Sequence, residues 1–213
     1  MYVVFLAGGI ASGKSTVAQE LRRRGAGCVD LDALSREATA RGSKALVGIA
    51  REFGSDVLDE EGNLRRSVLA QRAFCSEERT RELERIVHPH VRALLREWLE
   101  SNRDQGVCVV EIPLLDRVED LVPMADEVLC VTCPVEVRRE RAIGRGMDGK
   151  DFDARASKQA SDAYLEEHGT SFIRNVGTRA ELQHEINRWW EGALKRAANP
   201  GTSVSICEVA DEH

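Results

Sequence analysis

The chain has 213 residues and a formal net charge of −6. This length suits one good core with embellishments rather than two independent domains. The acidic balance gives no general electrostatic footprint for nucleic acid or an anionic membrane surface, so we expect neither as a partner. No apolar run approaches the length of a membrane span, and the amino terminus lacks the pattern of a secretory signal. The sequence therefore predicts a cytoplasmic protein.

The amino-terminal segment carries the most specific motif. An apolar run leads directly into GGIASGKST, in which Gly8, Gly13, Lys14 and Ser15 complete the pattern G-x-x-x-x-G-K-[ST]. A loop of this kind wraps the phosphates of a nucleoside triphosphate in backbone N–H groups, and glycine is needed because a Cβ would block the close approach. The alternative is a glycine-rich turn between a strand and a helix that binds no ligand. We favour the phosphate-binding loop.

The motif assigns chemical roles to its residues. Lys14 is expected to reach the β- and γ-phosphates as a point charge, and Ser15 to place its hydroxyl on Mg²⁺. The helix that opens there would direct its N-terminal dipole at the anion. The residues expected to bind ATP in this loop are Gly8, Ala11, Ser12, Gly13, Lys14, Ser15 and Thr16.

The arrangement of apolar segments predicts an α/β fold. Helical patterns separate short segments that are typical of buried parallel strands. The first helical pattern places Val17, Ala18 and Leu21 on one face and ends at Gly25. Alternation of this kind indicates a three-layer fold with a parallel sheet that binds ligands at the carboxyl ends of its strands. The five expected strands are 3–6, 28–30, 107–110, 128–132 and 171–173.

A long insertion separates the second and third strands. Residues 33–106 carry at least three helical patterns, which is far more chain than one crossover needs. The last pattern has an apolar stripe interrupted by Pro89, which removes a backbone donor and should kink or split the helix. His88 and His90 flank this break, where sites are common. A ligand role for His88 is one interpretation, and core packing of this helix is the other.

A second unusual segment contains Arg138, Arg139, Arg141 and Arg145 at helical spacing before a glycine-rich turn. These arginines could lie on a solvated helix face and pair with neighbouring glutamates. Alternatively, Arg141 and Arg145 share a face of a mobile flap that closes cationic groups over phosphates. We favour the flap. The tail, 197–213, has no periodic apolar face and is expected to be frayed.

A phosphate-binding loop identifies a nucleotide and leaves the reaction open. The base-reading N-K-x-D of a GTPase is absent, and the short acidic chain argues against a motor ATPase. Asp30 and Asp32 end the second strand, which we expect beside the first, with its carboxyl end facing the loop. A carboxylate there could accept the proton of an attacking hydroxyl, and we assign this role to Asp32. The alternative is that one of these aspartates caps the next helix.

The order and spacing of several blocks resemble one family from the amino terminus to about Trp190. The blocks are GGIASGKST, VDLDALSR, FGSDVLDEEGNLRRSVLAQRAF, IVHPHV, EIPLL and DEVLCVTCPVEVRRERAIGRG with a downstream Gln159. Together they are similar to dephospho-coenzyme A kinase. The resemblance implies a single P-loop kinase domain over 1–196, with a helical acceptor-binding insertion at about 33–106 and a lid at about 138–158.

The resemblance also implies the substrates and their contacts. ATP and Mg²⁺ would serve the phosphorylation of dephospho-coenzyme A at its ribose 3′-hydroxyl, with Asp32 as the base. Arg66, His88 and the Pro113–Leu114 pair would contact the acceptor. Two alternatives stay open: another small-molecule P-loop kinase, and a non-catalytic ATP-binding interaction protein, which the departures from the family pattern near Asp116 and Phe172 make conceivable. Glu111 could be a Mg²⁺-linked acid or a solvated strand end.

Overall fold

The computed structural model describes residues 1–199 of the chain. The chain forms two compact units. The first comprises Met1–Val29 and the chain from Asn102 onward, and the second comprises Asp30–Ser101. Within residues 1–199, no helix combines the length and apolar character that crossing a membrane requires.

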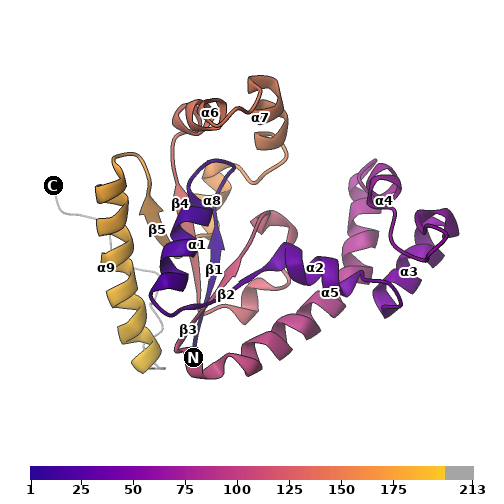
Figure 1. Cartoon of the computed structure of the whole chain (residues 1–213), viewed down its shortest axis with the longest axis horizontal. Helices are drawn as coiled ribbons and strands as arrows, with labels where there is room; N and C mark the ends of the chain where they lie inside the picture. The colour runs from indigo at the N-terminus through magenta and orange to yellow at the C-terminus, as the bar shows by residue number, and fades with distance from the viewer. Residues whose placement is uncertain (200–213) are drawn as a thin grey trace. The chain divides into compact units, whose positions relative to one another are not determined.

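A five-stranded sheet forms the centre of the first unit, with strand order β2-β3-β1-β4-β5 (Figure 1). The pairs β1–β3, β1–β4 and β4–β5 are parallel. Leu6 of β1 lies opposite Glu111 of β3 and Leu129 of β4. The expected α/β fold with a five-stranded parallel sheet is confirmed. The strands are β1 (Tyr2–Ala7), β2 (Gly27–Asp30), β3 (Val107–Glu111), β4 (Glu127–Thr132) and β5 (Ser171–Arg174).

One expectation about the sheet was wrong: β2 does not lie beside β1, because β3 lies between them. The difference has a physical reason. Residues Val107 and Val110 of β3 are fully buried, as suits a strand with neighbours on both sides, whereas most of β2 is only half-buried, as suits an edge. The chain between β2 and β3 is long enough to reach either position, so its length does not select the neighbour.

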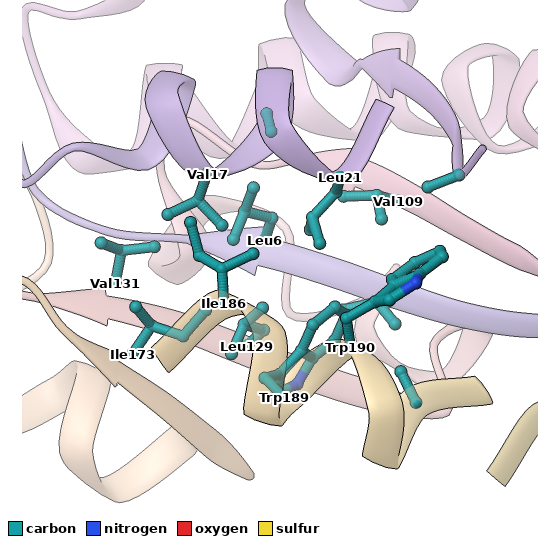
Figure 2. Packing of buried hydrophobic residues seen from close by; sticks show 14 of the residues in the cluster. Leu6, Val17, Leu21, Val109, Leu129, Val131, Ile173, Ile186, Trp189 and Trp190 are labelled. Carbon is teal, nitrogen blue, oxygen red and sulfur yellow. The ribbon is translucent and has the colours of Figure 1, made fainter. Parts of the chain in front are cut away.

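Helices α1, α8 and α9 of the first unit pack on this sheet. The first, α1 (Lys14–Arg23), follows the loop directly and ends before Gly25, whose φ of +95° permits the reversal that joins it to β2. Figure 2 shows Val17 and Leu21 of α1 and Trp189 of α9 directed at the sheet. The remaining helices of this unit are α6 (Val135–Gly144), α7 (Gly149–Ala156), α8 (Asp162–His168) and α9 (Arg179–Ala198).

A buried carboxyl group fastens α9 to the amino-terminal end of the sheet. Glu127, the first residue of β4, is 5% exposed. It accepts hydrogen bonds from Tyr2 Oη at 2.8 Å, Trp189 Nε1 at 2.6 Å and Arg196 at 2.9 Å, and also from Ser171 Oγ. Burial and the bond to Glu127 raise the pKa of Tyr2 to about 12, so Tyr2 remains a donor at neutral pH. We call this group the Glu127 cluster.

The second unit is helical, and its longest helix is α5. Pro89 lies inside α5, which runs without a break, so the expected split is not found. Pro89 is on the exposed side of the helix, where water can satisfy the carbonyl group that loses its partner. The expected functional boundaries, 1–196 with its insertion and lid, stay predictions. The helices of this unit are α2 (Leu31–Ala38), α3 (Lys44–Phe53), α4 (Arg66–Ala73) and α5 (Glu77–Ser101).

The expected tail, 197–213, overlaps the end of a helix, because α9 continues to Ala198. Residues 200–213 lie outside the described part of the chain.

Candidate active site

A pocket of about 260 Å³ lies where β1 gives way to α1 in the first unit. Its floor is the sequence motif itself, and three residues from distant parts of the chain complete it. The lining residues are Gly8, Gly9, Ile10, Ala11, Gly13, Lys14, Ser15, Thr16, Pro113, Arg145 and Gln159. The structure therefore brings together eight of the residues expected from the sequence: Gly8, Ala11, Gly13, Lys14, Ser15, Thr16, Pro113 and Arg145.

The loop needs glycine at two positions for different reasons. A Cβ on Gly8 would lie 2.7 Å from the carbonyl oxygen of Val131, so β4 leaves no room for a side chain. Gly13 has a φ of +101°, which side chains rarely adopt, and its Cβ would collide with Asn175 Nδ2. Ala11 adopts a φ of +60° without being glycine. The backbone is thus wound tightly enough to turn its N–H groups toward an anion.

Ser12 behaves differently from its neighbours. It was expected to bind nucleotide, yet it is 1% exposed and does not line the pocket. Its N–H donates to the carbonyl of Gly9 at 3.1 Å, and its own carbonyl accepts from Asn175 at 2.7 Å. The left-handed residues on either side of Ser12, Ala11 and Gly13, explain this inward orientation.

Lys14 and Ser15 are the first two residues of α1, as the motif predicts. The Lys14 ammonium donates to the carbonyl of Ile112, 3.1 Å away, just beyond the end of β3. This bond places a positive charge across the carboxyl ends of two adjacent strands, β1 and β3. The side chain of Ser15 is exposed in the pocket. A cation and a hydroxyl beside a helix N-terminus form a suitable environment for phosphate.

The segment after the third strand contributes Pro113 but not its neighbours. Leu114, expected beside Pro113 in an acceptor site, does not line the pocket. Glu111, the last residue of β3, lies 3.9 Å from Arg22 of α1 and is also outside the pocket lining. The Glu111 side chain is only 16% exposed, and its role stays a prediction.

The four arginines around α6 have four different environments. Arg138 is buried, donates to the Cys133 carbonyl at 2.9 Å and forms an ion pair with Asp162 at 2.8 Å. Neither the solvated face nor the flap interpretation anticipated this burial. Arg139 pairs with Asp153 at 3.1 Å on the surface.

The other two arginines are the pair expected to close over phosphates. Arg145 is exposed and lines the pocket. Arg141 does not line the pocket; it donates to the backbone carbonyl of Asn175 at 2.9 Å. A direct contact between Arg141 and phosphate stays a prediction.

Two residues of the site were not predicted from the sequence to contribute to it. Gln159 lies on the segment after α7 and accepts a hydrogen bond from the Ile10 N–H at 2.6 Å. Asn175 follows β5 and reaches the loop through Ser12. For Asn175 a signal existed: an amide side chain that directly follows a strand lies at the edge of a parallel sheet where ligands bind.

The second unit holds the remaining expected residues, Asp32, Arg66 and His88. Asp30, not Asp32, is the cap of α2, since its side chain accepts from the Asp32 N–H at 3.0 Å. The capping alternative therefore applies to Asp30, and Asp32 lies exposed in the first turn of α2. Arg66 begins α4 and donates to Thr39 Oγ1 at 3.3 Å. His88 is half-buried within α5. The roles of all three stay predictions.

Comparison with known proteins decides the family. The model of the CoaE family, described as dephospho-CoA kinase, matches residues 2–181. The chain belongs to the dephospho-CoA kinase family. It is 39% identical over 196 residues to the dephospho-CoA kinase of Corynebacterium diphtheriae, an alignment that covers 90% of this chain and 96% of that protein.

Two solved structures have a similar fold. The crystal structure of TT1252 from Thermus thermophilus has a TM-score of 0.75 and 30% identity, and the match covers 90% of this chain and 97% of that one. Dephospho-CoA kinase from Campylobacter jejuni has a TM-score of 0.66 at 22% identity, covering 91% and 97% of the two chains, and shows the shared fold.

Membership fixes the activity. The chain has dephospho-CoA kinase activity and is an enzyme of CoA biosynthesis. As a member of this kinase family it uses ATP, and dephospho-CoA is its substrate. This result decides against the two alternatives that the sequence left open, namely a kinase for another small molecule and a non-catalytic ATP-binding protein.

Proposed function

We propose that the chain transfers the γ-phosphoryl group of ATP to the ribose 3′-hydroxyl of dephospho-CoA in the cytoplasm, with the triphosphate bound in the P-loop pocket. The main support is the pocket, which combines Lys14, Arg145 and the loop backbone in about 260 Å³. In the transfer, the 3′-oxygen forms a bond to the γ-phosphorus while the bond from that phosphorus to the β–γ bridging oxygen breaks. The products are CoA and ADP.

Each part of the pocket has a defined task in this proposal. Backbone N–H groups of the loop and the N-terminus of α1 hold the phosphates, and Lys14 neutralises the charge that develops on them. Arg145 adds a second cation from the end of α6. Such groups act mainly by position and charge, because phosphoryl transfer requires little covalent chemistry from the protein.

The pocket suits Mg²⁺ bound together with a nucleotide. Mg²⁺ prefers oxygen ligands and is usually held by one or two protein groups together with substrate phosphates and water. Ser15 presents an exposed hydroxyl oxygen beside Lys14 in this pocket. We therefore propose that Ser15 is the ligand which the loop supplies, and that the ion neutralises phosphate charge when it is bound.

Asp32 is the proposed general base. It would accept the proton that leaves the 3′-hydroxyl as the new bond forms. Asp30 is the cap of α2, so the alternative that Asp32 caps this helix does not compete with the proposed role. Arg66, His88, Pro113 and Leu114 are proposed to contact the acceptor.

ADP release should depend on the acceptor and on one of its hydroxyl groups. We expect release with ATP, Mg²⁺ and dephospho-CoA, and background release with an analogue that lacks the ribose 3′-hydroxyl. An analogue that lacks only the 2′-hydroxyl is the matched control and should still be phosphorylated. Coupled measurement of ADP, with mass analysis of the product, provides the test. Equal turnover of both analogues would contradict transfer to the 3′-position.

Arg145 should matter more than its neighbour Arg139. Replacing Arg145 by Ala removes a cation from the pocket, so we expect kcat/KM for ATP to fall by about 10–100-fold. Arg139→Ala also removes an arginine side chain, but this one lies in a surface ion pair with Asp153. It should leave kinetics and stability nearly unchanged. Steady-state rates with varied ATP measure both effects. Equal kinetics for the two variants would remove Arg145 from the proposed site.

A further inference from the structure

Asn175 joins three parts of the first unit. It directly follows β5 and is only 8% exposed. Its N–H donates to the carbonyl of Thr132 at the end of β4, 2.9 Å away. Its own carbonyl accepts from Arg141 of α6 at 2.9 Å, and its side-chain Nδ2 donates to the carbonyl of Ser12 at 2.7 Å. A buried amide is thus fixed between the sheet, α6 and the phosphate-binding loop.

The contact with Ser12 has a consequence for the next residue. No peptide bond among the described residues is cis, so the Ser12 carbonyl and the Gly13 N–H point in opposite directions from their shared peptide plane. Asn175 holds the carbonyl on the buried side of the loop. The Gly13 N–H is thereby turned to the other side, and Gly13 lines the pocket.

Glycine at position 13 is part of the same arrangement. Its φ of +101° suits glycine, and a Cβ would meet the Asn175 amide itself. The close approach of Asn175 therefore requires the residue type that the motif provides. Ser12 is fixed from its other end as well, because its N–H is bound to Gly9.

We propose that Asn175 is a positioning residue for nucleotide binding: it fixes the Ser12–Gly13 peptide so that the Gly13 N–H faces the phosphates of ATP. Arg141 acts one step further away, by holding the Asn175 backbone. A donor that is already oriented stabilises the bound anion without reorganisation when the ligand arrives. This inference rests on the proposed binding of ATP in the pocket.

Asn175→Asp is the sharpest test, because it keeps the shape of the side chain and removes the donor. A carboxylate oxygen facing the Ser12 carbonyl favours rotation of that peptide. We expect the Kd for ATP to rise by about 10–100-fold, the range of one hydrogen bond to a charged group. The KM for dephospho-CoA at saturating ATP should stay within twofold of the parent value. A purely structural role would change both constants together.

The chain offers a matched control for the same substitution. Asn187 on α9 is exposed, and its side-chain oxygen accepts from Arg24 and Gln183. Asn187→Asp keeps these acceptor contacts, so its ATP affinity should equal that of the parent. Arg141→Ala should weaken ATP binding by loosening Asn175, and Arg141→Lys should restore part of the affinity because lysine can still donate to the Asn175 carbonyl.

A second variant keeps the inference testable if Asn175→Asp does not fold. Asn175→Ser removes the amide that donates to Ser12 without adding a charge, so it should fold and should bind ATP more weakly than the parent but more tightly than Asn175→Asp. Calorimetry with ATP and amide hydrogen exchange of the loop are the measurements. A folded variant of either kind that binds ATP within twofold of the parent overturns the inference.

Lys14→Ala separates this inference from the assignment of the site. If Lys14→Ala leaves ATP affinity unchanged, the pocket is not the nucleotide site and both proposals fail. If Lys14→Ala weakens ATP binding while Asn175→Asp does not, only the role of Asn175 is overturned.

Discussion

Asp32→Asn is expected to lower turnover by about 10²–10⁴-fold, the usual contribution of a general base. Asparagine keeps the shape of the side chain and much of its hydrogen bonding, but it cannot accept a proton. ATP affinity should be almost unchanged, because Asp32 is proposed to act on the acceptor hydroxyl. Lys14→Ala should differ from it by weakening ATP binding as well as turnover.

Asp30→Asn is the matched control for this experiment. Asparagine caps helices about as well as aspartate, so α2 should keep its N-terminus and turnover should stay close to that of the parent. Steady-state rates and calorimetry with ATP on the three variants give the comparison. Turnover of Asp32→Asn within a few-fold of the parent would reassign Asp32 to positioning.

Replacing Glu127 by Ala should be among the most destabilising single changes in the first unit. The change removes the buried acceptor of the Glu127 cluster and leaves the donors of Tyr2, Ser171, Trp189 and Arg196 without it. Removing one partner of a buried charged network costs about 3–5 kcal/mol of unfolding free energy. For a chain of this size, the melting temperature should fall by on the order of 10 °C.

Glu185→Ala on α9 controls for the loss of a glutamate. Glu185 pairs with Arg188 in an i,i+3 arrangement at the surface, so its removal should cost less than about 1 kcal/mol. Denaturant unfolding followed by tryptophan fluorescence compares the two variants. An equal midpoint for Glu127→Ala and the parent would show that α9 is held by its apolar face alone.

The three central strands, β1, β3 and β4, could be predicted because they are buried on both faces. Continuous apolar runs such as Val107–Val110 differ clearly from the helical patterns between them, and their positions were confirmed. The order of strands was harder to predict, because an insertion that separates β2 from β3 does not determine which strands pair. The prediction that Pro89 splits α5 was wrong for a related reason. The sequence shows that proline removes a backbone hydrogen bond, but it does not show that the carbonyl group which loses its partner faces water.

The candidate site was predictable where function depends on local sequence. Lys14 and Ser15 are recognised by their spacing within one loop, and both line the pocket. The contact of Asn175 with Ser12 was not predictable, because it joins residues 163 positions apart in the chain. The four arginines of the α6 segment share one periodic pattern, so periodicity could not separate the buried Arg138 from the exposed Arg145.

The Glu127 cluster also bears on how the chain folds. Tyr2 and Arg196 bind the same carboxyl group, and the Arg196 guanidinium lies 5.4 Å from the centre of the Tyr2 ring. These contacts join residues almost two hundred positions apart, so they raise the contact order of the first unit. During synthesis, β1 leaves the ribosome before α9, and this end of the sheet can close only when α9 has been made. We therefore expect α9 to dock late in folding. Until it docks, the incomplete sheet exposes apolar surface, and chaperones would bind to this surface.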